Sequence, residues 1–232
     1  MLEVRQLTAG YGSAQVLNGV DLTLKNREVM AVLGRNGVGK TTFLKSVMGI
    51  LPARSGRVVL DGSAINGLPT FAIARQGVGY VPQGRGIFDK LTVEENLQMG
   101  LRACRKRTDR IPDFIYEKFP ILHERRQQPA GSMSGGQKQQ LAISRALCSD
   151  PKVLLLDEPS EGIQPNIVQD IGRLIRELVT QRDIAVVVVE QNLELVHQAC
   201  DRFCIMVKGR IVHVGEQSEL HDEELLRSHL TI

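Results

Sequence analysis

The chain has 232 residues, of which 42% are hydrophobic and 24% charged, and it carries a formal net charge of +3. This length suffices for one sizeable core, or for a core with an inserted subdomain. So small a charge does not favour a nucleic-acid partner. No apolar run approaches the roughly 20 residues that cross a bilayer, and the N-terminal MLEVRQLTAG lacks a signal-peptide pattern. We therefore expect a cytosolic protein that a partner would hold if it works at a membrane.

Short apolar segments alternate with helical patterns along the chain. Residues 16–24 alternate apolar and polar side chains, as a half-buried strand does. Further strands are predicted over 27–34, 56–62, 77–83, 152–158 and 183–190, and a hairpin with a Lys208–Gly209 turn over 202–215. Helical patterns cover 40–48, 166–180 and 192–199. Continuous apolar strands separated by helices predict an α/β fold with a mainly parallel sheet covered on both faces.

The residue pattern changes over 84–149, which is helical or polar and contains no convincing strand. Thr92 and Glu95 have the spacing of a capping box, which predicts a helix start. We interpret this stretch as a helical subdomain inserted into a core made of residues 1–83 and 150–232. Its basic run over 102–110 is either a solvated helix end or a surface that contacts phosphate or lipid headgroups.

The cysteines do not predict a metal site. Cys200 and Cys204 lie near His197, but no second ligand pair follows at zinc spacing. Together with Cys104 and Cys148, they are expected to be reduced and mostly buried thiols.

One glycine-rich turn between a predicted strand and a helix fits the pattern G-x-x-x-x-G-K-[ST]. Glycines let backbone N–H groups turn toward an anion, and the following helix adds its positive end. The lysine would reach the β- and γ-phosphates of a nucleotide, and the threonine hydroxyl would ligate Mg²⁺. A glycine-rich turn without a ligand is the alternative. This phosphate loop consists of Gly34, Arg35, Asn36, Gly37, Val38, Gly39, Lys40, Thr41 and Thr42.

A second apolar strand ends in two adjacent carboxylates, Asp157 and Glu158. Ligands of parallel sheets sit beyond the carboxyl ends of the strands, where the phosphate loop also lies. We therefore expect Asp157 to hold Mg²⁺ through water and Glu158 to polarise the water that attacks the γ-phosphate. Asp157 could instead cap the following turn.

The motif Ser134-Gly135-Gly136-Gln137, here called the signature loop, stands shortly before that strand. Together with GRNGVGKTT, YVPQG and LLLDEP in this order, it resembles the ATP-binding subunits of ABC transporters over the whole chain. The resemblance implies an α/β P-loop core with an N-terminal antiparallel β part, and ATP and Mg²⁺ as ligands. It also implies a head-to-tail dimer in which the signature loop of one subunit closes over the ATP of the other.

The resemblance assigns two further residues. Tyr11 matches the aromatic residue that stacks on adenine, although it could be an ordinary exposed turn tyrosine. Gln83 matches the glutamine that contacts Mg²⁺ and senses the γ-phosphate, and it begins the helical subdomain.

Three positions depart from the family pattern. Met133 stands where leucine is usual, which is a conservative change. Gln164 stands where many members have aspartate, and Gln191 where a histidine usually follows the strand. Glutamine can donate a hydrogen bond but cannot carry a positive charge. Either hydrolysis at this site is weakened, or Glu158 suffices as the base and Gln191 only positions. We expect the second.

Finer motifs such as YVPQGRGIF, EGIQP and VVEQN resemble importers of urea and of branched-chain amino acids, with the urea type preferred. Such an importer implies a second ATPase subunit, two membrane permease subunits and a periplasmic solute-binding protein. The chain would lie at the cytoplasmic face of the inner membrane. A soluble regulatory module without a permease, and an exporter of lipid or polysaccharide, are the other candidate functions.

Overall fold

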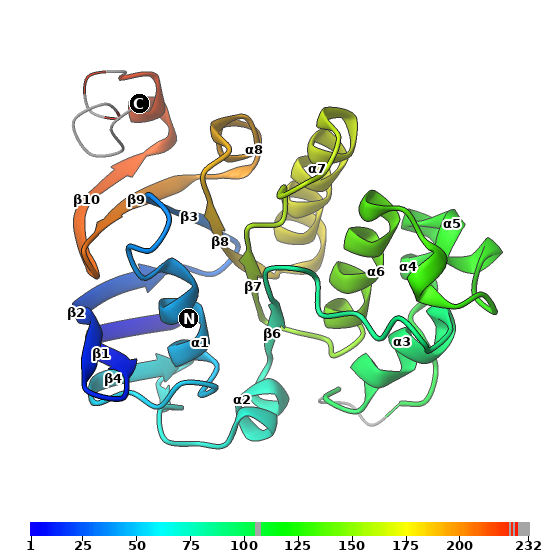
Figure 1. Ribbon diagram of the computed structural model, residues 1–232, viewed down its shortest axis with the longest axis horizontal. Helices are drawn as coiled ribbons and strands as arrows, with labels where there is room; N and C mark the ends of the chain where they lie inside the picture. The colour runs from blue at the N-terminus through cyan, green and yellow to red at the C-terminus, as the bar shows by residue number, and fades with distance from the viewer. Residues whose placement is uncertain (105–107, 223, 225, 227–232) are drawn as a thin grey trace.

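The computed structural model describes residues 1–104, 108–222, 224 and 226. It contains a small sheet beside a larger central sheet, and a group of helices on the opposite side of the central sheet (Figure 1). The basic run predicted over 102–110 includes residues 105–107, which lie outside the described residues.

The smaller sheet is antiparallel and has the strand order β2-β1-β4-β5. Its strands are β1 (Leu2–Tyr11), β2 (Ala14–Leu24), β4 (Ser55–Leu60) and β5 (Ser63–Ala64). We did not predict β1, because its alternation breaks between Val4 and Leu7. The pairing shifts register there, and Gln6 has a φ of +47°, so both apolar residues still point into the core.

The central sheet has the order β10-β9-β3-β8-β7-β6 and is parallel except for the β9–β10 hairpin. Every residue of the neighbouring β3, β8 and β7 is buried, which explains their continuous apolar sequences. Lys208 and Gly209 form the hairpin turn with φ of +46° and +72°, as predicted. The strands are β3 (Val29–Leu33), β6 (Val78–Val81), β7 (Val153–Asp157), β8 (Ala185–Glu190), β9 (Arg202–Val207) and β10 (Arg210–Glu216).

Two groups of helices surround these sheets. The first is α1 (Lys40–Val47), α2 (Thr70–Gln76), α7 (Pro165–Arg182) and α8 (Leu193–Ala199). The second is α3 (Val93–Leu101), α4 (Asp113–Lys118), α5 (Pro120–Glu124) and α6 (Gly135–Leu147), which Figure 1 shows gathered on the side away from α1. Two 3₁₀ turns are η1 (Ala130–Ser132) and η2 (Gln217–His221). The capping box at the start of α3 is confirmed, because Thr92 Oγ1 accepts from Glu95 N at 3.1 Å and Glu95 Oε2 accepts from Thr92 N at 2.7 Å.

The central sheet separates two hydrophobic cores. Alternate residues of β3, such as Met30 and Val32, pack with the small sheet and α1. Their neighbours Ala31 and Leu33 pack with α3 and α5 to α8. The predicted α/β fold with its antiparallel N-terminal part is therefore confirmed. The helices α3 to α6 fall within 84–149, but the domain boundaries themselves stay a prediction.

The cysteines are free, as expected: Cys148, Cys200 and Cys204 are buried and Cys104 is half-buried. Burial raises the pKa of the Cys148 and Cys204 thiols to about 12, so both remain protonated and unreactive at neutral pH. Among the described residues, no cluster of histidine, cysteine, aspartate and glutamate side chains could hold a metal by itself.

Candidate functional site

The candidate site lies at the carboxyl edge of the central sheet. The parallel pairing of β3, β8, β7 and β6 brings their C-terminal ends to one edge. The phosphate loop follows β3, Gln83 follows β6 by two residues, Asp157 ends β7, and Gln191 follows β8. Four segments far apart in the sequence therefore meet, as the position of ligand sites in parallel sheets predicts.

The phosphate loop has the backbone of an anion cradle. Gly37 and Gly39 have φ of +80° and +114°, which side-chain-bearing residues rarely adopt. Gly39 precedes α1, whose N-terminus has no side-chain cap and no acidic residue in its first turn. The first N–H groups of this helix thus remain available to an anion, and no acidic residue of the helix's own first turn opposes one.

Lys40 is the main cation of the loop. Its side chain is 4% exposed, and its ammonium lies 3.4 Å from Glu158 Oε1 and donates to the carbonyls of Gly34 at 2.8 Å and Arg35 at 3.1 Å. These two carbonyls hold the ammonium group inside the loop. When a nucleotide binds, its phosphate oxygens would take their place as hydrogen-bond acceptors. These observations fit a nucleotide phosphate.

Asp157 is a buried carboxylate with two hydroxyl partners. It is 2% exposed and accepts from Thr41 Oγ1 at 3.0 Å and from Tyr80 Oη at 3.2 Å. Burial raises its pKa, and the charge of Glu158 adds to this, while the two hydroxyl donors work against it. A hard cation that needs few protein oxygens, such as Mg²⁺ with its waters and phosphate ligands, fits Thr41 and Asp157.

The raised pKa of Asp157 gives a testable stability effect. Its carboxyl ionises less readily in the folded chain than at its ordinary value of 3.8, so the ionised form costs stability at neutral pH. We expect Asp157→Asn to raise the free energy of unfolding of the nucleotide-free protein in EDTA by about 0.5–2 kcal/mol at pH 7.5. The gain should shrink as the pH falls through the raised pKa and vanish where Asp157 is protonated in both states. Urea unfolding at several pH values measures it, and a destabilised variant at pH 7.5 would contradict the prediction.

Glu158 occupies the centre of the site with a strained backbone. Its φ is +48°, and its N–H donates to Val189 O at 2.9 Å. Its side chain is 11% exposed. Its carboxylate accepts from Gln83 Nε2 at 3.3 Å and from Gln191 Nε2 at 3.2 Å, besides facing Lys40. Backbone strain of this kind is common at functional sites, where the surroundings hold the residue in place.

The structure therefore brings together most of the predicted residues around Glu158. Gln191 also donates to Asn36 Oδ1 at 2.7 Å, which joins the end of β8 to the phosphate loop. The cleft formed here has a volume of about 430 Å³. It is lined by Val16, Asn36, Gly37, Gly39, Lys40, Thr41, Thr42, Gln83, Glu158 and Glu161.

The signature loop does not line this cleft. Ser134 caps α6, with its hydroxyl accepting from Gln137 N at 3.3 Å while Gln137 Oε1 accepts from Ser134 N at 3.1 Å. Within the chain, Gly135 and Gly136 lie beside Arg85 and Ile167 respectively. The expected role of Ser134, Gly135, Gly136 and Gln137 toward ATP therefore stays a prediction that needs a second chain.

Tyr11 ends β1 beside the cleft-lining strand β2 and is 50% exposed. An exposed ring is free to stack on a base, but the residue's proposed contact with adenine also stays a prediction.

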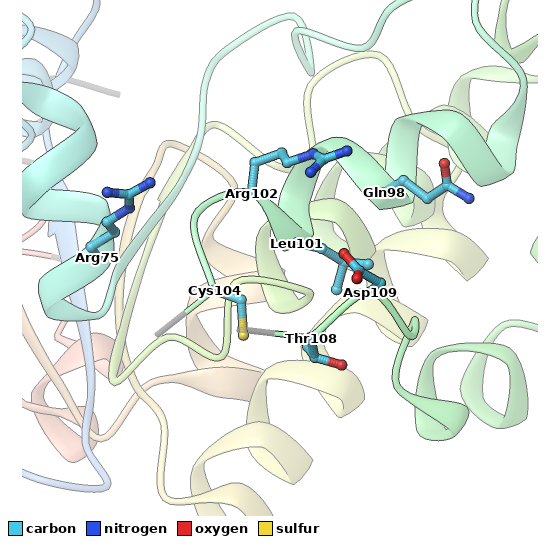
Figure 2. A pocket seen from close by; sticks show the side chains of 7 residues that line it. All are labelled: Arg75, Gln98, Leu101, Arg102, Cys104, Thr108 and Asp109. Atoms are coloured by element: carbon cyan, nitrogen blue, oxygen red, sulfur yellow. The ribbon is translucent and has the colours of Figure 1, made fainter. Parts of the chain in front are cut away.

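A larger hollow of about 830 Å³ lies between α2 and α3 and holds none of the predicted site residues. Arg75 projects from α2 on one side, and Gln98 of α3 and Arg102, the residue after α3, lie on the other (Figure 2). We assign this hollow no function.

Three residues near the site were not assigned from the sequence. Tyr80 donates to Asp157, and the carboxylate of Glu161 accepts from Gln83 at 3.1 Å. Glu190 ends β8 and is 2% exposed. Only Glu190 had a sequence signal, since it is a charge at the end of an apolar strand.

Comparison with known proteins identifies the family of the chain. Residues 17–161 match the family described as ABC transporter. The chain is 42% identical over 213 residues to the high-affinity branched-chain amino acid transport ATP-binding protein BraG of Pseudomonas aeruginosa, with 91% of each chain covered. It is 36% identical over 226 residues to the probable branched-chain amino acid transport ATP-binding protein LivF of Archaeoglobus fulgidus, covering 97% and 95%. It is also 36% identical over 235 residues to the lipopolysaccharide export system ATP-binding protein LptB of Escherichia coli K12, covering 99% and 96%.

Solved structures share the fold. A nucleotide-free ATP-binding cassette from an ABC transporter superposes with a TM-score of 0.82 at 27% identity, covering 97% of this chain and 94% of the other. The ADP conformation of MJ1267, an ATP-binding cassette of an ABC transporter, gives a TM-score of 0.82 at 26% identity, covering 98% and 97%. In the part of the chain that the structure describes, no helix has the length and apolar character to span a membrane. The chain therefore belongs to the ABC transporter family, as an ATP-binding and ATP-hydrolysing subunit.

Proposed function

We propose that this chain powers an ABC importer of branched-chain amino acids. The observation that carries the hydrolytic part is the arrangement around Glu158, whose carboxylate faces Lys40, Gln83 and Gln191 within 3.4 Å. The solute class is supported by the two relatives named for branched-chain amino acid transport. The chain's own site faces a nucleotide, so it carries no information on the solute.

In the proposed mechanism, different residues of the cleft bind the phosphates, hold Mg²⁺, accept the proton and orient the base. Lys40 and the N–H groups at the start of α1 hold the β- and γ-phosphates. Thr41, Asp157 and Gln83 would hold Mg²⁺, which neutralises charge on the phosphates when bound. Glu158 accepts a proton from water as the water oxygen bonds to the γ-phosphorus and the bond to the β-phosphate oxygen breaks. Gln191 donates from its side-chain amide to Glu158 and to Asn36, which orients the Glu158 carboxylate.

The position of the signature loop indicates the first partner of the chain. It lies outside the chain's own cleft, which supports a head-to-tail dimer with a second ATPase subunit. We further infer contact with two membrane permease subunits and, through them, with a periplasmic solute-binding protein. Helices α3 to α6, within 84–149, would pass the state of Gln83 to the permeases. With these partners, the chain would lie at the cytoplasmic face of the inner membrane.

Gln191 provides a test of the positioning role. Gln191→Ala removes the amide that bridges Asn36 and Glu158, so we expect the rate of ATP hydrolysis to fall about tenfold. The affinity for ATP should change little, because the phosphate loop keeps Lys40 and its backbone. Phosphate release and calorimetric ATP titration measure the two quantities. Gln169→Ala, on the exposed face of α7, is the control, and unchanged hydrolysis in Gln191→Ala would remove Gln191 from the mechanism.

The solute is tested by uptake. In cells lacking this chain, uptake of labelled leucine at low external concentration should fall and return with the wild-type chain but not with Glu158→Gln. Loss of urea uptake alone would overturn the branched-chain proposal in favour of the urea type. The motif EGIQP favours urea, but none of the relatives named above is named for urea, and that prediction stays open. A defect in lipopolysaccharide export with both uptakes intact would instead place the chain with the LptB relatives.

A further inference from the structure

We propose that Glu190 is a positioning residue for ATP hydrolysis, whose carboxylate ties the segment that carries Glu158 to the segment that carries Gln191. This inference goes beyond the proposed transport function and depends only on ATP hydrolysis by the family. Glu190 does not line the nucleotide cleft, so its effect would pass through the two segments that it joins.

The carboxylate of Glu190 is buried and accepts three backbone hydrogen bonds. Oε1 accepts from Ser160 N at 2.9 Å, and Oε2 accepts from Gln191 N at 2.9 Å and from Asn192 N at 3.1 Å. Across residues 1–104 and 108–222, no ion pair is formed by Glu190. The buried charge is therefore compensated by N–H dipoles, which form stronger bonds to a carboxylate than to a neutral acceptor.

Only one of these bonds joins distant parts of the chain. Gln191 and Asn192 follow Glu190 directly, and a carboxylate at any strand end could accept from them. Ser160 lies 30 residues earlier, in the turn after β7. This bond fastens that turn to the end of β8, two residues beyond the bond from Glu158 N to Val189 O.

The fastened turn helps to hold Glu158 in its unusual backbone conformation, together with the bond from Glu158 N to Val189 O. Glu158 lies two residues before Ser160 and has a φ of +48°, which persists only where its surroundings determine it. On the other side of Glu190, the Gln191 side chain donates to Glu158 Oε1. Glu190 thus holds the backbone of Gln191, whose side chain orients the base, and adds a link from Ser160 to the bond that the Glu158 N–H already makes to Val189 O at 2.9 Å.

The chemistry is sensitive to such positioning. A misplacement of about 1 Å at a reacting group can cost about 100-fold in rate. Loss of the Glu190–Ser160 bond would lower the rate of the chemical step. ATP affinity would be spared, because Glu190 contacts neither Lys40 nor the start of α1.

The test compares Glu190→Gln with a matched control, Glu28→Gln, in the full-length protein. The Glu28 carboxylate is 5% exposed and also accepts a backbone N–H, from Lys25, but it pairs with Arg202 away from the cleft. We expect Glu190→Gln to lower kcat about 10- to 100-fold with KM for ATP within about threefold of wild type. Glu28→Gln should lower the melting temperature without changing kcat.

A second variant keeps the test decisive if Glu190→Gln folds poorly. Glu190→Asp keeps the charge and can keep the bonds to the N–H groups of Gln191 and Asn192. Because its side chain is one methylene shorter, it should lose the hydrogen bond from Ser160 N. It should show the same fall in kcat with a melting temperature near wild type. Wild-type kcat in Glu190→Asp, or a rise in KM that matches the fall in kcat, would overturn the proposal. An equal loss of kcat in Glu28→Gln would overturn it too, since the effect would then be one of general stability.

Discussion

Glu158→Gln is expected to lower the rate of ATP hydrolysis by roughly 10²–10⁴-fold, the usual contribution of a general base. The amide has nearly the shape of the carboxylate but cannot take a proton from the attacking water. ATP should still bind, because Lys40 and the start of α1 are unchanged and Lys40 loses a competing carboxylate at 3.4 Å. The variant should therefore separate binding from chemistry.

Three measurements on the purified chain decide this prediction. Phosphate release gives the rate, calorimetric titration gives the affinity for ATP, and gel filtration with ATP shows whether the variant accumulates as a dimer that hydrolysis no longer opens. Glu194→Gln makes the same change of charge at an exposed position on α8, where Glu194 accepts from Gln169 at 3.1 Å, and should leave the rate unchanged. Normal hydrolysis by Glu158→Gln would show that another group is the base.

The centre of the site could be predicted because its signals are local in sequence. The phosphate loop has fixed spacing between a strand and a helix, and Asp157 and Glu158 are charges at the end of a buried strand. Glu190 is such a charge as well, at the end of β8. The motif VVEQN contains Glu190 but does not reveal its role, because its partner Ser160 is 30 residues away in the sequence.

Other features depend on pairing that a single sequence does not reveal. Tyr80 reaches Asp157 only because β6 pairs with β7 in parallel, with Tyr80 opposite Leu155. Strand β1 was missed because the bulge at Gln6 hides its alternation. The role of the signature loop depends on a second chain, and the solute on permeases, so neither could follow from the fold of this chain.

Lys40→Ala is expected to weaken ATP binding about 10- to 100-fold, since a hydrogen bond to a charged group contributes about 1.5–3 kcal/mol. Hydrolysis should fall with it, because Lys40 also balances charge on the transferred phosphate. Lys40→Met keeps most of the aliphatic stem in its 4% exposed position but removes the charge and the N–H donors. It should weaken binding to the same extent, which distinguishes the loss of charge from a loss of packing.

Lys45→Ala is the matched control, because it removes a lysine from the last turn of the same helix, α1. Calorimetric titration with ATP should show full affinity for Lys45→Ala and weak binding for both Lys40 variants. If Lys40→Met bound ATP as tightly as the wild type, the uncapped start of α1 and the loop N–H groups would hold the phosphates by themselves. The bonds from Lys40 to the carbonyls of Gly34 and Arg35 would then be its main purpose, and the lysine would shape the cradle instead of binding the nucleotide.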